Sequence, residues 1–89
     1  MLEELFEIIQ DRKENAPEGS YTASLFESGE DRILRKIGEE AVEVLLAVKS
    51  EGEERILEET ADLFFHVLVM LAEKGLTLEQ VYGVLEGRR

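Results

Sequence analysis

The sequence contains no cysteine, no tryptophan and a single proline among its 89 residues. Without cysteine, the chain cannot form disulfide bonds, thiolate zinc sites or a cysteine nucleophile. Basic residues are also scarce, because 10 Lys and Arg stand against 21 Asp and Glu, which gives a formal net charge of -11. This charge repels a phosphate backbone, so non-specific nucleic-acid binding is disfavoured, and a phosphorylated substrate would need a cation to mediate.

Long hydrophobic runs are absent as well. No uninterrupted apolar stretch reaches the roughly 20 residues that a membrane-spanning helix requires, and the N-terminal MLEELFEII is acidic where a signal peptide would be basic. We therefore expect a cytoplasmic protein with no membrane partner. The length allows one small domain, and seven glycines with one proline are too few for a β-sandwich. We predict a single all-α domain over residues 1–89.

Apolar residues recur at helical spacing in four segments of the chain. These segments predict helices at about residues 2–14, 28–50, 53–74 and 77–85. The stretch APEGSYTASLFES, residues 16–28, shows no helical face, so we predict a loop with at most one short turn. A loop of this length in a small domain is often functional.

Two sequence patterns predict how helices begin. Ser28 is followed three residues later by Asp31, and Thr77 is followed three residues later by Gln80. In a capping box, the first residue accepts a hydrogen bond from the backbone of the fourth, and the fourth side chain bonds back. We therefore predict helix starts at Ser28 and at Thr77.

The two long helices are separated only by a short connection around Gly52, which predicts an antiparallel hairpin. Each helix also carries a second apolar set roughly opposite its main stripe. These sets are Val42 and Leu46 on the first helix and Phe65 and Val69 on the second. A lone hairpin would expose them, so we predict an antiparallel helical bundle completed by formation of a homodimer.

Acidic residues border the inner faces of both long helices. At about 100° per residue, Glu40 projects about 60° from the middle of its apolar stripe and Glu43 lies about 60° further round. On the second helix, Glu59, Asp62 and His66 follow one face at i, i+3 and i+7. We therefore expect the carboxylates of Glu40, Glu43, Glu59 and Asp62 to converge in one cleft.

Four carboxylates this close would repel one another in partly desolvated surroundings, so such a cluster favours a bound cation. Carboxylate oxygens without thiols suit a hard divalent ion, which points to Mg²⁺, with Mn²⁺ as an alternative. The simpler interpretation is a solvated acidic face paired with Lys and Arg. In that interpretation His66 bonds a neighbouring carboxylate, Lys36 forms a surface ion pair rather than a phosphate contact, and Ser20, Tyr21 and Thr22 only form a turn.

The runs GSYTASLFESGEDRILRKIGEEAVEVLLA and ETADLFFHVLVMLAEKGLTLEQV resemble phosphoribosyl-ATP pyrophosphohydrolase, and the resemblance extends over nearly the whole chain. A broader motif, EExxE on one helix and ExxD on the next, is similar to that of MazG-like all-α nucleotide pyrophosphohydrolases. It corresponds here to Glu39, Glu40, Glu43, Glu59 and Asp62. Phe65 stands where many relatives have tyrosine, so no hydroxyl is assigned a role there.

The resemblance implies Mg²⁺-dependent hydrolysis of the α–β phosphoanhydride of phosphoribosyl-ATP, the second step of histidine biosynthesis. It implies that Glu40, Glu43, Glu59 and Asp62 hold the metal and that Glu39, or whichever ligand is least committed to the metal, orients the attacking water. The substrate-binding candidates are Ser20, Tyr21, Thr22, Arg32, Lys36 and His66. The resemblance also implies a dimer, and we expect the next activity, a cyclohydrolase, on a separate chain.

Two other functions remain open from the sequence. A nucleotide-sanitising pyrophosphohydrolase of the same fold would use the same carboxylates on a free nucleoside triphosphate. A non-catalytic dimerisation or metal-binding module would release no pyrophosphate from any nucleotide. The loop at residues 19–25 favours phosphoribosyl-ATP, because its match is specific to that family.

Overall fold

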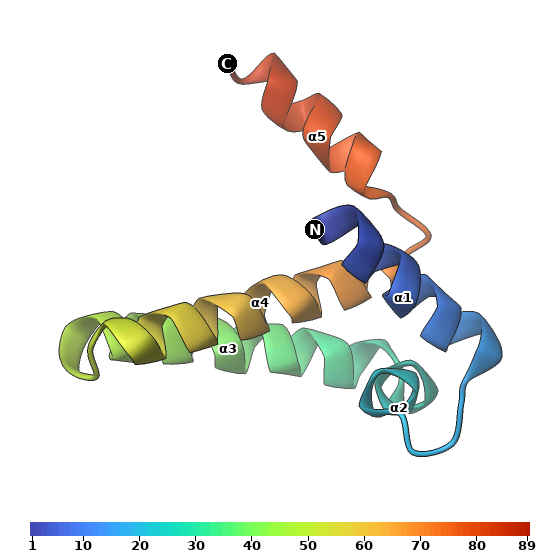
Figure 1. Cartoon of the computed structure of the whole chain (residues 1–89), viewed down its shortest axis with the longest axis horizontal. Helices are drawn as coiled ribbons and strands as arrows, with labels where there is room; N and C mark the ends of the chain where they lie inside the picture. The colour runs from blue at the N-terminus through green and yellow to red at the C-terminus, as the bar shows by residue number, and fades with distance from the viewer.

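The structure is a computed structural model that describes residues 1–89, and α-helix is the only regular structure in it. The five helices are α1 (Leu2–Asn15), α2 (Tyr21–Ser28), α3 (Glu30–Ser50), α4 (Glu53–Glu73) and α5 (Leu78–Gly87) (Figure 1). The predicted all-α fold is therefore confirmed. No helix combines the length and the apolar character that crossing a bilayer requires.

The two 21-residue helices α3 and α4 form the antiparallel hairpin that the sequence predicts (Figure 1). The turn between them is short because Gly52 takes φ 92° and ψ 172°, a backbone conformation that is almost restricted to glycine. The chain thus reverses within two residues, and the two helices lie side by side along their whole length.

The predicted loop at residues 16–28 is wrong in its second half, because Tyr21–Ser28 forms helix α2. Ser20 begins this helix: its hydroxyl accepts a hydrogen bond from the backbone N–H of Ala23 at 3.1 Å. Ala23 and Leu25 are then buried against the rest of the domain. Eight residues give only two helical turns, too few for an apolar period to appear in the sequence.

The predicted capping box at Ser28 is also wrong. Ser28 is the last residue of α2, and α3 begins at Glu30 after Gly29, with no side-chain cap. The Ser28 hydroxyl instead accepts a hydrogen bond from Arg32 at 2.8 Å. The capping box of Thr77 and Gln80 is confirmed, with both reciprocal hydrogen bonds formed at the start of α5.

The apolar core lies where α1 and α2 cover the junction of α3 with the C-terminal half of α4. It consists of Phe6, Ile9, Leu25, Ile33, Leu68, Val69, Leu71, Ala72 and Leu78. Helix α5 projects away from the hairpin beyond α1 (Figure 1). The domain therefore has one compact end, formed by α1 and α2, and one end formed by the bare hairpin.

This arrangement corrects the predicted second face of α4. Val69 is fully buried within the chain, and Phe65 packs against the core, because α1 and α2 cover this side of the helix. The corresponding set on α3 behaves as predicted, since Val42 and Leu46 are 53% and 48% exposed. An apolar surface therefore remains on the hairpin, although it does not include Val69.

Helix α2 is expected to be an integral part of the core, and Leu25 tests this. Leu25 is 0% exposed, so Leu25→Ala is expected to lower the free energy of unfolding by about 2–5 kcal/mol. The matched control is Leu34→Ala, since Leu34 is 48% exposed. Urea denaturation of both variants measures the difference. Equal losses in the two variants would mean that α2 does not contribute to the core.

Candidate metal and substrate site

Three carboxylates converge between the two long helices. Oxygen atoms of Glu40 from α3 and of Glu59 and Asp62 from α4 all lie within 4.8 Å of one another. Glu40 and Glu59 are 8% and 6% exposed, whereas Asp62 is exposed. The cluster is therefore inside the hairpin, with Asp62 on its solvent side. We call Glu40, Glu59 and Asp62 the carboxylate triad.

The seven-residue spacing of buried positions explains why these acids face inward. On α3 the buried residues are Ile33, Glu40 and Ala47, which repeat every seven residues and so share one face. On α4, Glu59 and His66 are buried at the same spacing. Glu40 thus occupies a position between two apolar residues. An acid at such a position is destabilising unless positive charge compensates it.

Two basic side chains supply part of that compensation. The Nζ atom of Lys36 lies 3.4 Å from Glu40 and 3.6 Å from Glu39, and the guanidinium of Arg55 contacts Glu59. In this structure Lys36 thus forms an ion pair, as the simpler interpretation of the sequence predicts. Arg55 was not predicted as a site residue, although it precedes Glu59 by four residues, as Lys36 precedes Glu40.

The compensation is incomplete. Burial raises the pKa of Glu59, the adjoining Glu40 and the negative charge of Asp62 raise it further, and the Arg55 guanidinium offsets only part of this. Burial alone would lower the pKa of Lys36, but its hydrogen bond to Glu40 and the surrounding negative charge raise it on balance. The triad is therefore short of positive charge, and its all-oxygen donor set fits a hard divalent cation.

Two predicted carboxylates stand apart from this group. Glu43 is half-buried one turn along α3 from Glu40, and the triad forms without it. Glu39 is exposed and pairs with Lys36. The predicted fourfold convergence is thus reduced to three side chains, because a step of three residues turns Glu43 about 60° away from the face of α3 that meets α4.

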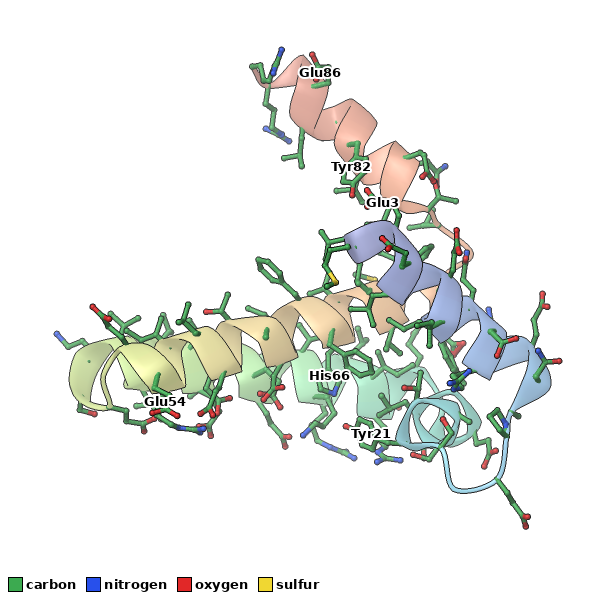
Figure 2. All side chains as sticks on the ribbon, viewed as in Figure 1. Glu3, Tyr21, Glu54, His66, Tyr82 and Glu86 are labelled. Atoms are coloured by element: carbon green, nitrogen blue, oxygen red, sulfur yellow. The ribbon has the colours of Figure 1, made fainter.

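His66 links the triad to α2. Its Nδ1 atom lies 2.7 Å from the backbone oxygen of Asp62, and its Nε2 atom lies 3.0 Å from the hydroxyl of Tyr21. Figure 2 shows Tyr21 reaching from α2 toward His66 on α4. The simpler interpretation, in which His66 bonds a neighbouring carboxylate, is wrong, because both nitrogens of the buried ring bond the Tyr21 hydroxyl and a backbone oxygen instead.

The remaining predicted substrate residues lie on or beside α2. Ser20 caps this helix and Thr22 is half-buried on it. The guanidinium carbon of Arg32 lies 5.7 Å from the centre of the Tyr21 ring, within reach of a cation–π contact. The structure thus brings Arg32, Tyr21 and His66 together in one series of contacts, with His66 bonded to the backbone of Asp62, while Ser20 caps the start of the helix.

The raised pKa of Glu59 has a consequence for stability. A raised pKa means that the folded protein keeps this proton at a pH where the unfolded chain has lost it, so the stabilising contribution is lost as pH rises. The metal-free unfolding temperature is expected to rise as the pH is lowered from neutral toward the ordinary pKa of a glutamate. Thermal denaturation in EDTA measures it. Glu59→Gln is expected to flatten this dependence, and an unchanged slope in the variant would contradict the assignment.

Comparison with known proteins identifies the family of the chain. The family model of phosphoribosyl-ATP pyrophosphohydrolase matches residues 2–89. The phosphoribosyl-ATP pyrophosphatase of Pelotomaculum thermopropionicum is 53% identical over all 89 residues, which cover 91% of that protein. The one of Metallosphaera sedula is 53% identical over 88 residues, which are 99% of this chain and 95% of that protein.

A longer relative carries the same domain. The histidine biosynthesis bifunctional protein HisIE of Caldanaerobacter subterraneus is 49% identical over 88 residues, or 99% of this chain, but only 43% of that protein is covered. A fused arrangement thus occurs among the relatives, and a cyclohydrolase on a separate chain stays a prediction. The match of one family model over residues 2–89, with relatives about half identical over the full length, shows that the chain belongs to the phosphoribosyl-ATP pyrophosphohydrolase family.

Proposed function

We propose that this chain hydrolyses the α–β phosphoanhydride of phosphoribosyl-ATP, giving phosphoribosyl-AMP and pyrophosphate, the second step of histidine biosynthesis. The observation that carries the proposal is the convergence of Glu40, Glu59 and Asp62 within 4.8 Å in a chain of this family. A cluster of oxygen donors that is short of positive charge can hold a cation, and a cation lets an acidic protein engage a polyphosphate.

In this proposal the carboxylate triad holds Mg²⁺ or Mn²⁺, with Glu43 as a further ligand from the next turn of α3. When bound, the ion supplies charge neutralisation for phosphate oxygens and lowers the pKa of a coordinated water. The fit rests on the donor set: carboxylate oxygens, two of them on buried residues, with the raised pKa of Glu59 marking a deficit of positive charge.

The other residues position the substrate and the attacking water. Glu39 is exposed and only loosely paired with Lys36, so its carboxylate is free to orient a water and accept its proton. Glu40, as a ligand, is the second catalytic carboxylate. Lys36 would turn from these acids to a phosphate oxygen. Water is the nucleophile, so no covalent intermediate with the protein forms. The water oxygen bonds to the α-phosphorus, its proton passes to Glu39, and pyrophosphate is the leaving group.

The region around α2 binds the rest of the substrate in this proposal. Ser20, Tyr21, Thr22 and Arg32 present hydroxyl and guanidinium groups for phosphate and ribose contacts. His66 supports them indirectly, since its buried ring holds the Tyr21 hydroxyl at 3.0 Å.

A pyrophosphate-release assay tests the proposed function. Phosphoribosyl-ATP is expected to be hydrolysed in the presence of Mg²⁺ and not in EDTA, with a higher kcat/KM than ATP, GTP or dUTP. A preference for an ordinary nucleoside triphosphate would favour the nucleotide-sanitising alternative. Failure to release pyrophosphate from any nucleotide would favour a non-catalytic module.

We also propose that the chain works as a homodimer formed through the bare end of the hairpin. Large apolar side chains are exposed there on both helices, namely Val42, Leu45 and Leu46 on α3 and Leu57 on α4. The three residues of α3 follow helical spacing and form an apolar stripe, and such exposed apolar patches mark interaction surfaces.

Light scattering coupled to gel filtration tests the homodimer. We expect twice the mass of one chain for the wild type and a single-chain mass for Leu45→Glu. Ile8→Glu is the control, because Ile8 is exposed on α1 rather than on the hairpin. A wild-type protein with the mass of one chain would contradict the dimer.

A further inference from the structure

Both long helices place a basic residue four positions before their buried carboxylate. Lys36 precedes Glu40 on α3, and Arg55 precedes Glu59 on α4. Because the helices are antiparallel, one turn back along α3 and one turn back along α4 lead in opposite directions. The two cations therefore bracket the carboxylate triad from its two ends along the hairpin.

Arg55 is held by several acids at once. Its Nη1 atom lies 2.5 Å from Glu58, its Nε atom lies 3.7 Å from Glu51, and its Nη2 atom contacts Glu59. The Arg55 side chain is 46% exposed, whereas that of Glu59 is only 7% exposed. The guanidinium thus lies at the solvent rim, with the buried carboxylate of Glu59 beneath it.

Loss of the contact with Glu59 would leave Arg55 well solvated and still paired. Glu58 and Glu51 are both exposed, and they would retain the guanidinium near the rim. Glu59 has no such alternative within its helix and depends on Arg55 or on another cation. The two partners of this ion pair therefore differ: Glu59 needs a positive charge, but Arg55 does not need Glu59.

A divalent cation at the triad would change this balance. It would use an oxygen lone pair of Glu59, and its two positive charges would repel the guanidinium a few ångströms away. Polyphosphate on the ion would bring negative oxygens to the same rim. The planar fork of an arginine matches two such oxygens at once, which a lysine does not.

We propose that Arg55 exchanges partners: it neutralises Glu59 in the metal-free protein and turns to a phosphate oxygen of the substrate or product once a divalent cation occupies the triad. This inference rests on the proposed function. In this proposal Arg55 competes with the metal for Glu59 and binds the phosphate. Removal of the Arg55 side chain should therefore raise the affinity for the metal and lower the affinity for pyrophosphate. A purely structural arginine would not produce that opposition.

Two titrations of Arg55→Gln test the exchange. Electron paramagnetic resonance measures Mn²⁺ binding, and calorimetry measures binding of inorganic pyrophosphate in saturating Mg²⁺. At low ionic strength, Mn²⁺ is expected to bind the variant roughly three- to tenfold more tightly, and pyrophosphate roughly tenfold more weakly. Arg88→Gln is the control, because it changes the net charge equally on the distant α5 and should alter neither affinity.

Arg55→Lys separates charge from geometry. It is expected to bind Mn²⁺ as the wild type does, because the charge is kept, but to bind pyrophosphate more weakly, because the fork is lost. Unchanged or weaker Mn²⁺ binding by Arg55→Gln, or unchanged pyrophosphate binding, would overturn the exchange while leaving the metal site in place. A wild-type protein that binds no Mn²⁺ would overturn the proposed function together with the exchange.

Discussion

Replacing Glu40 and Glu59 together by glutamine is expected to raise the unfolding temperature of the metal-free protein and to abolish its stabilisation by Mg²⁺. The amides keep the shape of both side chains but remove two like charges that lie within 4.8 Å of each other. The two basic residues still have ion-pair partners in this variant, because Lys36 remains paired with Glu39 and Arg55 with Glu58. Removal of the charges therefore leaves no cation buried without a partner.

The size of the Mg²⁺ effect follows from mass action. A ligand present at a hundredfold excess over its Kd stabilises the folded state by about 2.7 kcal/mol. For a domain of this size that shifts the unfolding temperature by roughly 10–20 °C. Scanning calorimetry with EDTA or Mg²⁺ measures the shift. We expect it in the wild type and expect less than about 2 °C in the double variant.

A charge-matched variant makes this measurement specific. Glu54→Gln with Glu79→Gln removes two exposed acids, one near the tip of the hairpin on α4 (Figure 2) and one on α5. This control is expected to keep the full Mg²⁺ shift. If Mg²⁺ stabilised the Glu40 and Glu59 variant as much as the wild type, the triad would not be the metal site.

Asp62→Asn is expected to lower kcat/KM for phosphoribosyl-ATP by roughly a thousandfold while leaving the fold intact. Metal-ion catalysis supplies several kcal/mol of charge stabilisation to a phosphoryl-transfer transition state, and a loss of about 4 kcal/mol corresponds to a thousandfold in rate. Asp62 is the exposed member of the triad. Its replacement therefore weakens the site without opening a cavity in the core.

Steady-state kinetics with a coupled pyrophosphate assay measures this loss. Asp31→Asn is the matched control, because Asp31 is an exposed aspartate in the first turn of α3, outside the triad. Its kcat/KM should stay within about threefold of the wild type, which corresponds to less than about 1 kcal/mol. An active Asp62→Asn variant with normal Mg²⁺ dependence would remove Asp62 from the metal site.

The hairpin and the acidic faces of α3 and α4 that form the site could be predicted, because long helices carry strong periodic signals. The short turn at Gly52 leaves α3 and α4 only an antiparallel arrangement, so acids on their facing stripes must meet. The spacing alone did not set the rotation of each helix against the other. For that reason Glu40 is more central than its position on the apolar stripe indicated, whereas Glu43 stands apart from the triad.

Contacts between distant parts of the chain account for the rest. Helix α2 is too short to show a period, and its position on α1 and α3 depends on packing that no local pattern encodes. The hydrogen bond from Tyr21 to His66 joins residues 45 positions apart, so no spacing in the sequence predicts it. The contact of Arg55 with Glu59, in contrast, follows the same four-residue spacing as the contact of Lys36 with Glu40 and could have been found.

Anomalous diffraction from crystals grown with Mn²⁺ shows whether a cation occupies the hairpin. We expect an anomalous peak within coordination distance of carboxylate oxygens of Glu40, Glu59 and Asp62, about 2.1–2.3 Å away as for hard divalent ions. We also expect the Arg55 guanidinium to have left Glu59. A fully occupied Mn²⁺ peak elsewhere, with the triad still paired to Lys36 and Arg55, would contradict a metal-dependent site between α3 and α4.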